Sequence, residues 1–310
     1  MQHPVFYTQT TKIGDEGEFF NAYRPLLFSI AYRMLGSAMD AEDVVQEAFL
    51  RWQQQNPATV VSPKSYLTTV VTHLSIDSLR SARVRREEYV GQWLPEPLVT
   101  DERGVDADPV ALAESLSIAF LMLLERLTPI ERAVFLLHDV FEYPFDDIAR
   151  IVGKSGTNCR QIALRARRHL GSERPRFVSH KEEQERLTEQ FMRAITSGDL
   201  QALLTLLADD VVAYSDGGGK VAAARRPVSG ADHVGRFFIG LAAKAPPAFT
   251  LRIATINGHP ALVGELDGRP YGVYSLEVAA GRIRAIRVVL NPDKLHGLER
   301  RTGEGLRTED

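Results

Sequence analysis

The sequence predicts a multidomain protein in which two all-α domains, the second with a helix-turn-helix, precede an α+β domain. Apolar residues recur at helical spacing through residues 16–87 and again through 112–172. From residue 184 onward, helical segments give way to β-rich runs separated by glycine turns. A chain of 310 residues is long enough for two or three such domains, each with its own core.

The first predicted domain, residues 1–87, contains three helices. One ends at Gly36, because glycine tolerates the backbone conformation that closes a helix. The next is expected to have Asp40 as its cap and to run to about Trp52. The third is predicted for residues 63–86 from its helical apolar spacing.

A linker and a second helical domain follow. Residues 88–111 are predicted to be extended, since the Trp93–Pro97 segment holds two prolines, which remove backbone donors. The second domain, residues 112–172, ends in a short helix, a turn at Gly153 and another helix that Ser155 can cap. This succession is typical of a helix-turn-helix.

The last helix of this motif, residues 155–170, carries side chains suited to reading DNA. Such a helix enters the major groove, and its first turns reach base edges. Asparagine and glutamine pair with adenine, arginine pairs with guanine, and further arginines bind phosphate. The DNA-binding candidates are Ser155, Thr157, Asn158, Arg160, Gln161, Arg165 and Arg168. The alternative is a basic surface helix of an ordinary bundle.

The net charge of −3 conceals strong local differences. Residues 155–176 carry six arginines and one glutamate, and residues 80–86 carry four arginines and no acid. Such local patches suit contact with nucleic acid on some faces of the protein. With one cysteine there is no internal disulfide, and neither a secretory signal nor a membrane span is visible, so we expect a cytoplasmic protein without membrane contact.

The third predicted domain, residues 184–302, follows a charged connector at 173–183 and precedes a tail at 303–310. Two helices, a strand and a further helix come first. Four strands are then expected at 249–256, 260–266, 271–279 and 282–290. The turns between them are Asn257-Gly258, Asp267-Gly268 and Ala280-Gly281. This turn chemistry favours hairpins, so we expect a curved antiparallel sheet.

Two parts of the chain resemble RNA polymerase sigma factors of the extracytoplasmic-function (ECF) group. Asp40–Trp52 is similar to the segment with which these proteins bind core polymerase. Leu127–Phe135 together with Tyr143–Leu170 resembles their promoter −35 recognition domain. The resemblance covers about residues 16–172 and implies an initiation factor, not an enzyme, whose partners are the RNA polymerase core (β′ and β subunits) and promoter DNA.

The resemblance also implies roles for individual residues of the first domain. Side chains that would face a basic coiled coil of the polymerase are Asp40, Glu42, Asp43, Gln46 and Glu47. A solvated acidic face is the alternative. Side chains that would open the −10 element, hold an unstacked base and bind phosphate are Tyr66, His73, Asp77, Arg80, Arg83, Arg85 and Arg86. Many ECF members have asparagine near the position of His73, so a purely structural histidine is the alternative there.

Three more segments resemble marks of the ECF subgroup with a C-terminal SnoaL-like domain: Trp93–Pro97, Asp216–Lys220 and Asn291–Leu295. The resemblance implies that the C-terminal domain is a cone-shaped α+β barrel that regulates the sigma domains in cis. The regulatory candidates are Trp93, Pro95, Asp216, Gly217, Gly218, Gly219, Lys220, Asn291, Pro292, Asp293, Lys294 and Leu295. A flexible turn after a strand and a chain-terminating turn are the alternatives for the last two segments.

No catalysis, metal site or cofactor is expected in the C-terminal domain. Tyr214, Asp216 and Tyr274 could line a cavity, so an unknown small-molecule ligand is an open expectation. Asp232 is explained without chemistry, because Ser229 and Asp232 have the spacing of a capping box.

Two other classes of protein stay open as alternatives. One is a SnoaL-like enzyme with a DNA-binding front end, which would turn over a substrate without altering polymerase activity. The other is a repressor or activator that binds duplex DNA without polymerase and leaves residues 40–52 unused. Cys159 is expected to be a small, tolerated side chain; a redox switch, which needs an exposed thiol of low pKa, is the alternative.

Overall fold

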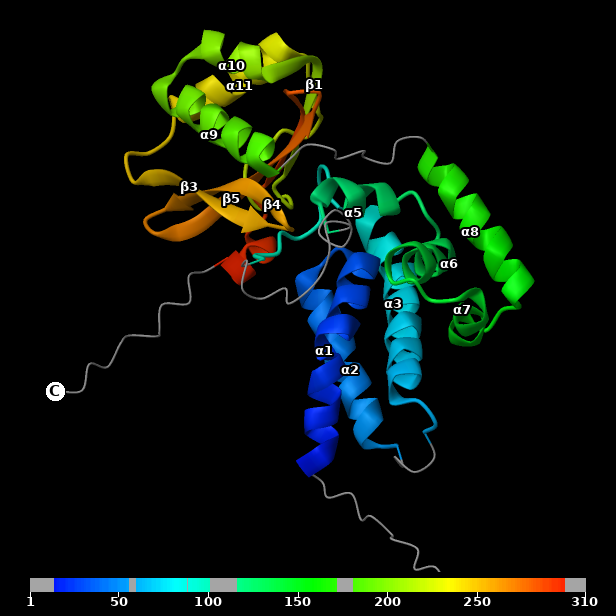
Figure 1. The fold of residues 1–310 in the computed structure, drawn as a ribbon. Coiled ribbons are helices and arrows are strands. Elements are labelled where there is room, and N and C mark those ends of the chain that lie inside the picture. The colour runs from blue at the N-terminus through cyan, green and yellow to red at the C-terminus, as the bar shows by residue number, and fades with distance from the viewer. Residues whose placement is uncertain (1–13, 56–59, 88, 101–115, 172–180, 299–310) are drawn as a thin grey trace, which may run out of the picture.

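The computed structural model places a helical body beside an α+β domain (Figure 1). It describes residues 14–55, 60–87, 89–100, 116–171 and 181–298, with side chains described except at 14–19 and 82–87. The predicted tail at 303–310 and much of the predicted linker and connector lie outside the described residues.

The three helices predicted for the first domain are confirmed. They are α1 (Gly14–Leu35), α2 (Ala38–Gln53) and α3 (Pro63–Glu87). The predicted cap of α2 is wrong. Ser37 caps this helix, since its side chain accepts a hydrogen bond from the backbone N of Asp40 at 3.2 Å, and Asp40 lies inside the first turn. Gly36, with φ +68°, makes the short connection that brings Ser37 into this position.

The second helical domain contains the predicted helix-turn-helix. Its elements are α5 (Ile118–Leu124), α6 (Pro129–Phe135), a π-helical turn (Leu136–Val140), α7 (Phe145–Val152) and α8 (Gly156–Leu170). Gly153 adopts φ +65°, the left-handed conformation that closes α7. Ser155 then caps α8 by accepting from the backbone N of Asn158 at 3.2 Å. Local sequence signals alone therefore define the motif.

The two helical domains pack directly against each other. Leu67 and Val71 of α3 belong to the same buried cluster as Phe135 of α6 and Ile148 of α7. Figure 1 shows α6 and α7 beside α3. We call this packing of the second domain on the first the closed arrangement.

Polar contacts support the closed arrangement. Arg132 of α6, 2% exposed, donates to the carbonyl of Met34 in α1 at 2.6 Å and to that of Leu124 at 2.7 Å. It therefore satisfies a carbonyl at the C-terminal end of a helix in the other domain. The hydroxyls of Thr68 in α3 and Tyr143, which precedes α7, form a hydrogen bond at 3.1 Å.

The C-terminal domain is a six-stranded sheet with helices on one face (Figure 1). Its helices are α9 (Lys181–Ser197), α10 (Leu200–Leu206) and α11 (Ala231–Ala242). Its strands are β1 (Leu207–Asp216), β2 (Val228–Ser229), β3 (Phe249–Ile256), β4 (His259–Leu266), β5 (Arg269–Ala279) and β6 (Arg282–Val289). Phe191 and Phe238 bring α9 and α11 into the same core as β1 and β6. This is the α+β architecture expected from the SnoaL-like resemblance.

The expectation of a wholly antiparallel sheet is wrong. The strand order is β2-β1-β6-β5-β4-β3, and β1 pairs with β6 in parallel, with Ala213 opposite Ile286. The turns that predicted antiparallel pairing join only β3 to β6, whereas β1 reaches β6 through α11 and the three hairpins. The hairpin turns themselves are confirmed, because both residues of each have positive φ, from +50° to +77°.

The predicted capping box at the start of α11 is also wrong. Gly230, not Ser229, is the cap residue of this helix, and it has no side chain to accept a hydrogen bond. The exposed Asp232 instead pairs with Arg236 one turn later, at 2.8 Å.

Candidate polymerase, promoter and linker-docking sites

The acidic side chains of α2 lie on the face opposite its buried stripe. Ala41, Val45 and Ala48 face the core. Glu42, Asp43 and Gln46 are exposed, and Asp40 and Glu47 are partly exposed. Glu42 pairs with Arg24 at 2.5 Å and Glu47 with Arg51 at 2.8 Å, all about half exposed. Exposed pairs of this kind add little stability and separate at low cost when a charged partner binds.

The side chains predicted to act at the −10 element are distributed along α3. Tyr66 is half-buried, with its ring centroid 6.0 Å from that of Trp52. His73 and Asp77 are exposed, and Asp77 pairs with the exposed Arg80 at 3.1 Å. The side chains of Arg83, Arg85 and Arg86 lie outside the described residues. The structure thus places His73, Asp77 and Arg80 on one accessible stretch of α3.

Helix α8 separates its buried and exposed side chains cleanly. Its core side chains are Cys159, Ile162, Ala163, Ala166 and Leu170. Its exposed candidates are Ser155, Thr157, Arg160, Gln161, Arg165 and Arg168, and Asn158 is half-buried. The Arg160 guanidinium lies 5.4 Å from the ring centroid of Phe145 in α7, which orients it near the N-terminal end of the helix. The surface is the one that a recognition helix would present to the major groove.

The redox alternative for Cys159 is wrong. Its side chain is 0% exposed, and burial raises the pKa of the thiol even though Arg160 and Lys154 act in the opposite direction. A buried thiol of raised pKa reacts slowly with oxidants. Cys159 is therefore a small core residue of α8.

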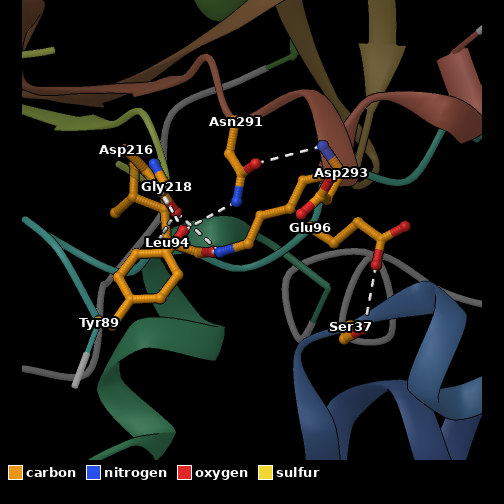
Figure 2. A network of polar contacts seen from close by, with 9 residues as sticks. Ser37, Tyr89, Leu94, Glu96, Asp216, Gly218, Asn291 and Asp293 are labelled. Atoms are coloured by element: carbon orange, nitrogen blue, oxygen red, sulfur yellow. Dashed lines mark hydrogen bonds and ion pairs between the residues drawn. The ribbon is translucent and has the colours of Figure 1, made fainter. Parts of the chain in front are cut away.

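Asp216 lies at the centre of a cluster that joins the linker to the C-terminal domain (Figure 2). Its carboxylate is fully buried at the end of β1. Oδ1 accepts from the Tyr89 hydroxyl at 2.6 Å and from the backbone N of Gly218 at 3.0 Å. Oδ2 accepts from the backbone N of Leu94 at 2.8 Å and from Lys294 Nζ at 2.7 Å. We call Tyr89, Leu94, Asp216, Asn291 and Lys294 the linker-docking cluster.

Lys294 also binds the linker. Its Nζ also donates to the carbonyl of Leu94 at 2.6 Å, so both backbone groups of this linker residue are bound by the C-terminal domain. The ammonium lies 4.4 Å from the ring centroid of Trp93 and 5.1 Å from that of Tyr89, which are cation–π distances. Only 11% of the Lys294 side chain is exposed, so these partners replace the water that would otherwise surround its charge.

The glycines after Asp216 are required by close packing. A Cβ on Gly218, which has φ +60°, would lie 2.4 Å from the Asn291 side chain, and one on Gly217 would lie 2.5 Å from the carbonyl of Val221. Asn291 donates to the Tyr89 hydroxyl at 2.9 Å and accepts from the backbone N of Asp293 at 3.2 Å. The segments Asp216–Lys220 and Asn291–Leu295, far apart in sequence, therefore form one site.

On its other side the linker contacts the first helical domain. Glu96, 7% exposed, accepts through Oε2 from the backbone N of Ala38 at 2.8 Å and of Met39 at 3.2 Å. The same oxygen accepts from Ser37 Oγ at 3.0 Å (Figure 2). A linker carboxylate thus satisfies free N–H groups at the start of α2, where negative charge is favourable. A Cβ on Gly36 would lie 2.9 Å from the Trp93 ring, so Trp93 packs against the same connection.

Three residues that join the linker or the sigma domains to the rest of the chain were not predicted from the sequence: Tyr89, Glu96 and Asn257. Glu96 lies within the Trp93–Pro97 segment and could have been added to it. Asn257 was assigned only to a hairpin turn, and no sequence pattern signals its contacts with other domains.

A cavity of about 430 Å³ lies beside the linker-docking cluster. Its walls include Val90 and Gly91 of the linker and the Lys220–Arg225 segment of the C-terminal domain. Tyr274 is instead packed against the domain core, and burial raises its pKa to about 12. Within the described residues there is no group of three or more potential metal ligands and no helix long and apolar enough to cross a membrane.

Comparison with known proteins identifies the helical domains. Residues 19–85 match the family model of Sigma-70 region 2, and residues 117–170 match that of Sigma-70 region 4. The chain is 41% identical over 301 residues to the ECF RNA polymerase sigma factor SigJ of Mycobacterium tuberculosis, covering 90% of this chain and 92% of that protein. It is 26% identical to the ECF RNA polymerase sigma factor SigG of the same species, over 90% of this chain and 82% of that protein.

The three-domain fold is shared as well. The crystal structure of the Mycobacterium tuberculosis sigma factor SigJ matches with a TM-score of 0.72 and 36% identity, covering 91% of this chain and 99% of that one. The likeness extends through the linker and the C-terminal domain, because no single domain could account for that coverage. This chain therefore belongs to the ECF RNA polymerase sigma factors, non-enzymatic initiation factors that bind the polymerase core and direct it to promoter DNA.

Proposed function

We propose that the C-terminal domain regulates this sigma factor in cis by stabilising the closed arrangement of the two sigma domains. The observation that carries the proposal is the linker, which is bound on one side by Asp216 and Lys294 and on the other by the start of α2. A domain that binds the linker between the two sigma domains can favour one distance between these domains over another. It does so through contacts that differ between the closed and the promoter-bound states.

We infer that the closed arrangement is too compact to bind both promoter elements at once. The positions −10 and −35 lie about 25 base pairs apart. At 3.4 Å per base pair this corresponds to about 85 Å of duplex. The longest helix of the helical body, α3, has 25 residues and is about 37 Å long. Because α6 and α7 pack directly on α3, the domains must separate before both elements can be bound.

The surfaces that would act after opening follow from the sequence assignments. We propose that residues 1–87 form the polymerase- and −10-binding domain, 112–172 the −35-binding domain and 184–302 the regulatory domain. The exposed acids of α2 would bind a basic surface of the β′ subunit, and the second domain would contact the β subunit. The exposed side chains of α8 would read the −35 element, with Arg160 and Gln161 nearest the base edges.

The decisive experiment is run-off transcription with purified core polymerase and the full-length protein. Promoter-specific transcripts that depend on the protein would support promoter selection. The same assay with a chain lacking residues 184–310 tests regulation in cis, and we expect its transcript yield to differ from that of the full chain. Equal yields over a range of core concentrations would refute regulation by the C-terminal domain. Such a result would not contradict promoter selection by the sigma domains.

The cavity beside the linker-docking cluster supports a ligand as the source of regulation. A molecule there would contact Val90 and Gly91 of the linker as well as the C-terminal domain, so it could favour one linker position. Arg225 at its wall favours a small anion, and Lys220, which pairs with Asp293, lies at the same wall. Citrate and inorganic phosphate are suitable probes, because anion binding here should raise the thermal midpoint of the full chain and raise it less in Arg225→Ala. Equal shifts in the two proteins would refute this site.

A further inference from the structure

We infer that Asn257 is a positioning residue through which the C-terminal domain holds both sigma domains and the linker at one point. The inference rests on the proposed regulation in cis and deepens it. Asn257 is the first residue of the β3–β4 turn, far in sequence from the linker-docking cluster and 1% exposed. A side chain at a hairpin tip is ordinarily solvated, so burial here reflects contact with other domains.

The side-chain amide of Asn257 bonds to three separate parts of the chain. Nδ2 donates to the hydroxyl of Tyr32 in α1 at 2.6 Å and to the carbonyl of Leu116, just before α5, at 2.8 Å. Oδ1 accepts from the backbone N of Leu98 in the linker at 3.0 Å. We call Asn257, Tyr32, Leu98 and Leu116 the Asn257 junction. It uses both amide donors and an acceptor, which an aspartate of the same shape cannot provide.

The residues around the junction add further hydrogen bonds to it. The Tyr32 hydroxyl, 0% exposed, donates to the carbonyl of Glu96 at 2.7 Å. The same bonds therefore also hold Glu96, whose carboxylate binds the N–H groups at the start of α2. The backbone N of Asn257 donates to the carbonyl of Leu98 at 2.8 Å. Beside it the linker forms an antiparallel bridge between Val99 and Ile256. Buried polar groups held this way cost free energy whenever one partner leaves.

The junction can exist only in the closed arrangement. Tyr32 belongs to the first sigma domain and Leu116 leads into the second, and one amide nitrogen bonds to both. When the domains separate to bind the −10 and −35 elements, at least one of these bonds must break. The junction therefore stabilises the closed state relative to the open state, and a contact can regulate only if it favours one of the two states.

Asn257→Asp tests the inference, and the neighbouring hairpin supplies a matched control. The substitution preserves the turn, because Asp267 occupies the same position of the β4–β5 turn with φ +50°, against +54° for Asn257. It removes both donors and places a carboxylate against the carbonyl of Leu116. Asp267→Asn makes the reverse change at an exposed turn and should have no effect.

The readout is the distance between the two sigma domains in the free, full-length protein. Fluorophores or spin labels attached through Val61→Cys and Leu164→Cys report it, since these residues are 103% and 48% exposed, whereas the native Cys159 is buried and need not be replaced. We expect Asn257→Asp to raise the ratio of open to closed molecules by about tenfold or more, the factor expected when a buried polar group loses its partners. A distance distribution identical to that of the Asp267→Asn control would overturn the inference.

A second variant keeps the test decisive if Asn257→Asp fails to fold. Tyr32→Phe removes only the hydroxyl, and it should open the protein in the same direction by a smaller factor; no opening in this variant would also overturn the junction. Run-off transcription then separates the two hypotheses. Opening by Asn257→Asp with unchanged transcription would support the junction and refute regulation in cis. No opening, with altered transcription after deletion of residues 184–310, would refute the junction and leave regulation in cis standing.

Discussion

Asp216→Asn should release the linker from the C-terminal domain. The carboxylate is fully buried and accepts four hydrogen bonds, one of them from the ammonium of Lys294, which is itself 11% exposed. Asparagine keeps the shape of the side chain but removes its charge. Its amide N–H groups would also face groups that are themselves hydrogen-bond donors. The substitution therefore removes the carboxylate that pairs with a buried ammonium.

The magnitude follows from the burial of the pair. Breaking a buried ion pair by removing one partner costs about 3–5 kcal/mol, so the equilibrium between docked and released linker should change by a factor of roughly 100 to several thousand. Asp293→Asn is the matched control, because the Asp293 carboxylate pairs with Lys220 at 2.6 Å with both side chains about half exposed. Loss of such a surface pair costs about 0–1 kcal/mol.

Tryptophan fluorescence can follow linker release. The chain has two tryptophans, and Trp52→Phe would leave Trp93, whose ring lies 4.4 Å from the ammonium of Lys294, as the only reporter. We expect urea titration of the two asparagine variants to change the Trp93 fluorescence at a lower urea concentration in Asp216→Asn than in Asp293→Asn. Adding Lys294→Met to Asp216→Asn should recover part of the loss, since no unpaired charge is then buried. If Asp216→Asn shifts the transition no more than Asp293→Asn, the linker-docking cluster does not hold the linker.

Three more outcomes are expected. Arg160→Ala should weaken binding of a duplex −35 element by about 1–3 kcal/mol in a titration of the isolated DNA, and unchanged affinity would argue against a base contact. Glu96→Ala should cost about 0.5–2 kcal/mol of stability at the start of α2, because the amides of Ala38 and Met39 lose their acceptor. Hydrogen exchange at these two amides should become faster, and equal exchange would count against a stabilising role of Glu96. Burial lowers the pKa of His259 below 6.5, so the folded state binds the proton less readily than the unfolded chain. Stability should therefore fall as pH drops below about 6.5, and fall less in His259→Gln, as thermal unfolding across pH would show.

Most secondary structure was predictable from the sequence because its causes are local. The helix-turn-helix follows from a glycine in the left-handed conformation at 153 and a capping serine at 155. The three hairpins follow from turn residues that tolerate positive φ. The exposed arginines of α8 follow from helical periodicity, which places Ile162 and Leu170 in the core. Such signals act over a few residues and need no knowledge of the rest of the fold.

The pairing of distant segments was not predictable in this way. The parallel pairing of β1 with β6 joins segments separated by three hairpins, and no turn between them signals it. The prediction that Asp40 caps α2 is wrong, because Ser37 and Asp40 are both good cap residues and local sequence does not choose between them. In the structure Ser37 caps the helix, and the linker carboxylate of Glu96 bonds to Ser37 and to the backbone N of Ala38.

The sequence by itself determined the family, the exposed faces of α2 and α8, and the three segments that supply every residue of the linker-docking cluster except Tyr89. Only the tertiary structure decided that the two sigma domains share one core and that Asp216 and Asn257 hold the linker between them. The reason is physical: periodicity and turn chemistry report which face of an element is apolar and where it ends. The partner of a buried carboxylate or amide depends on which distant backbone groups the folded chain brings within hydrogen-bonding distance.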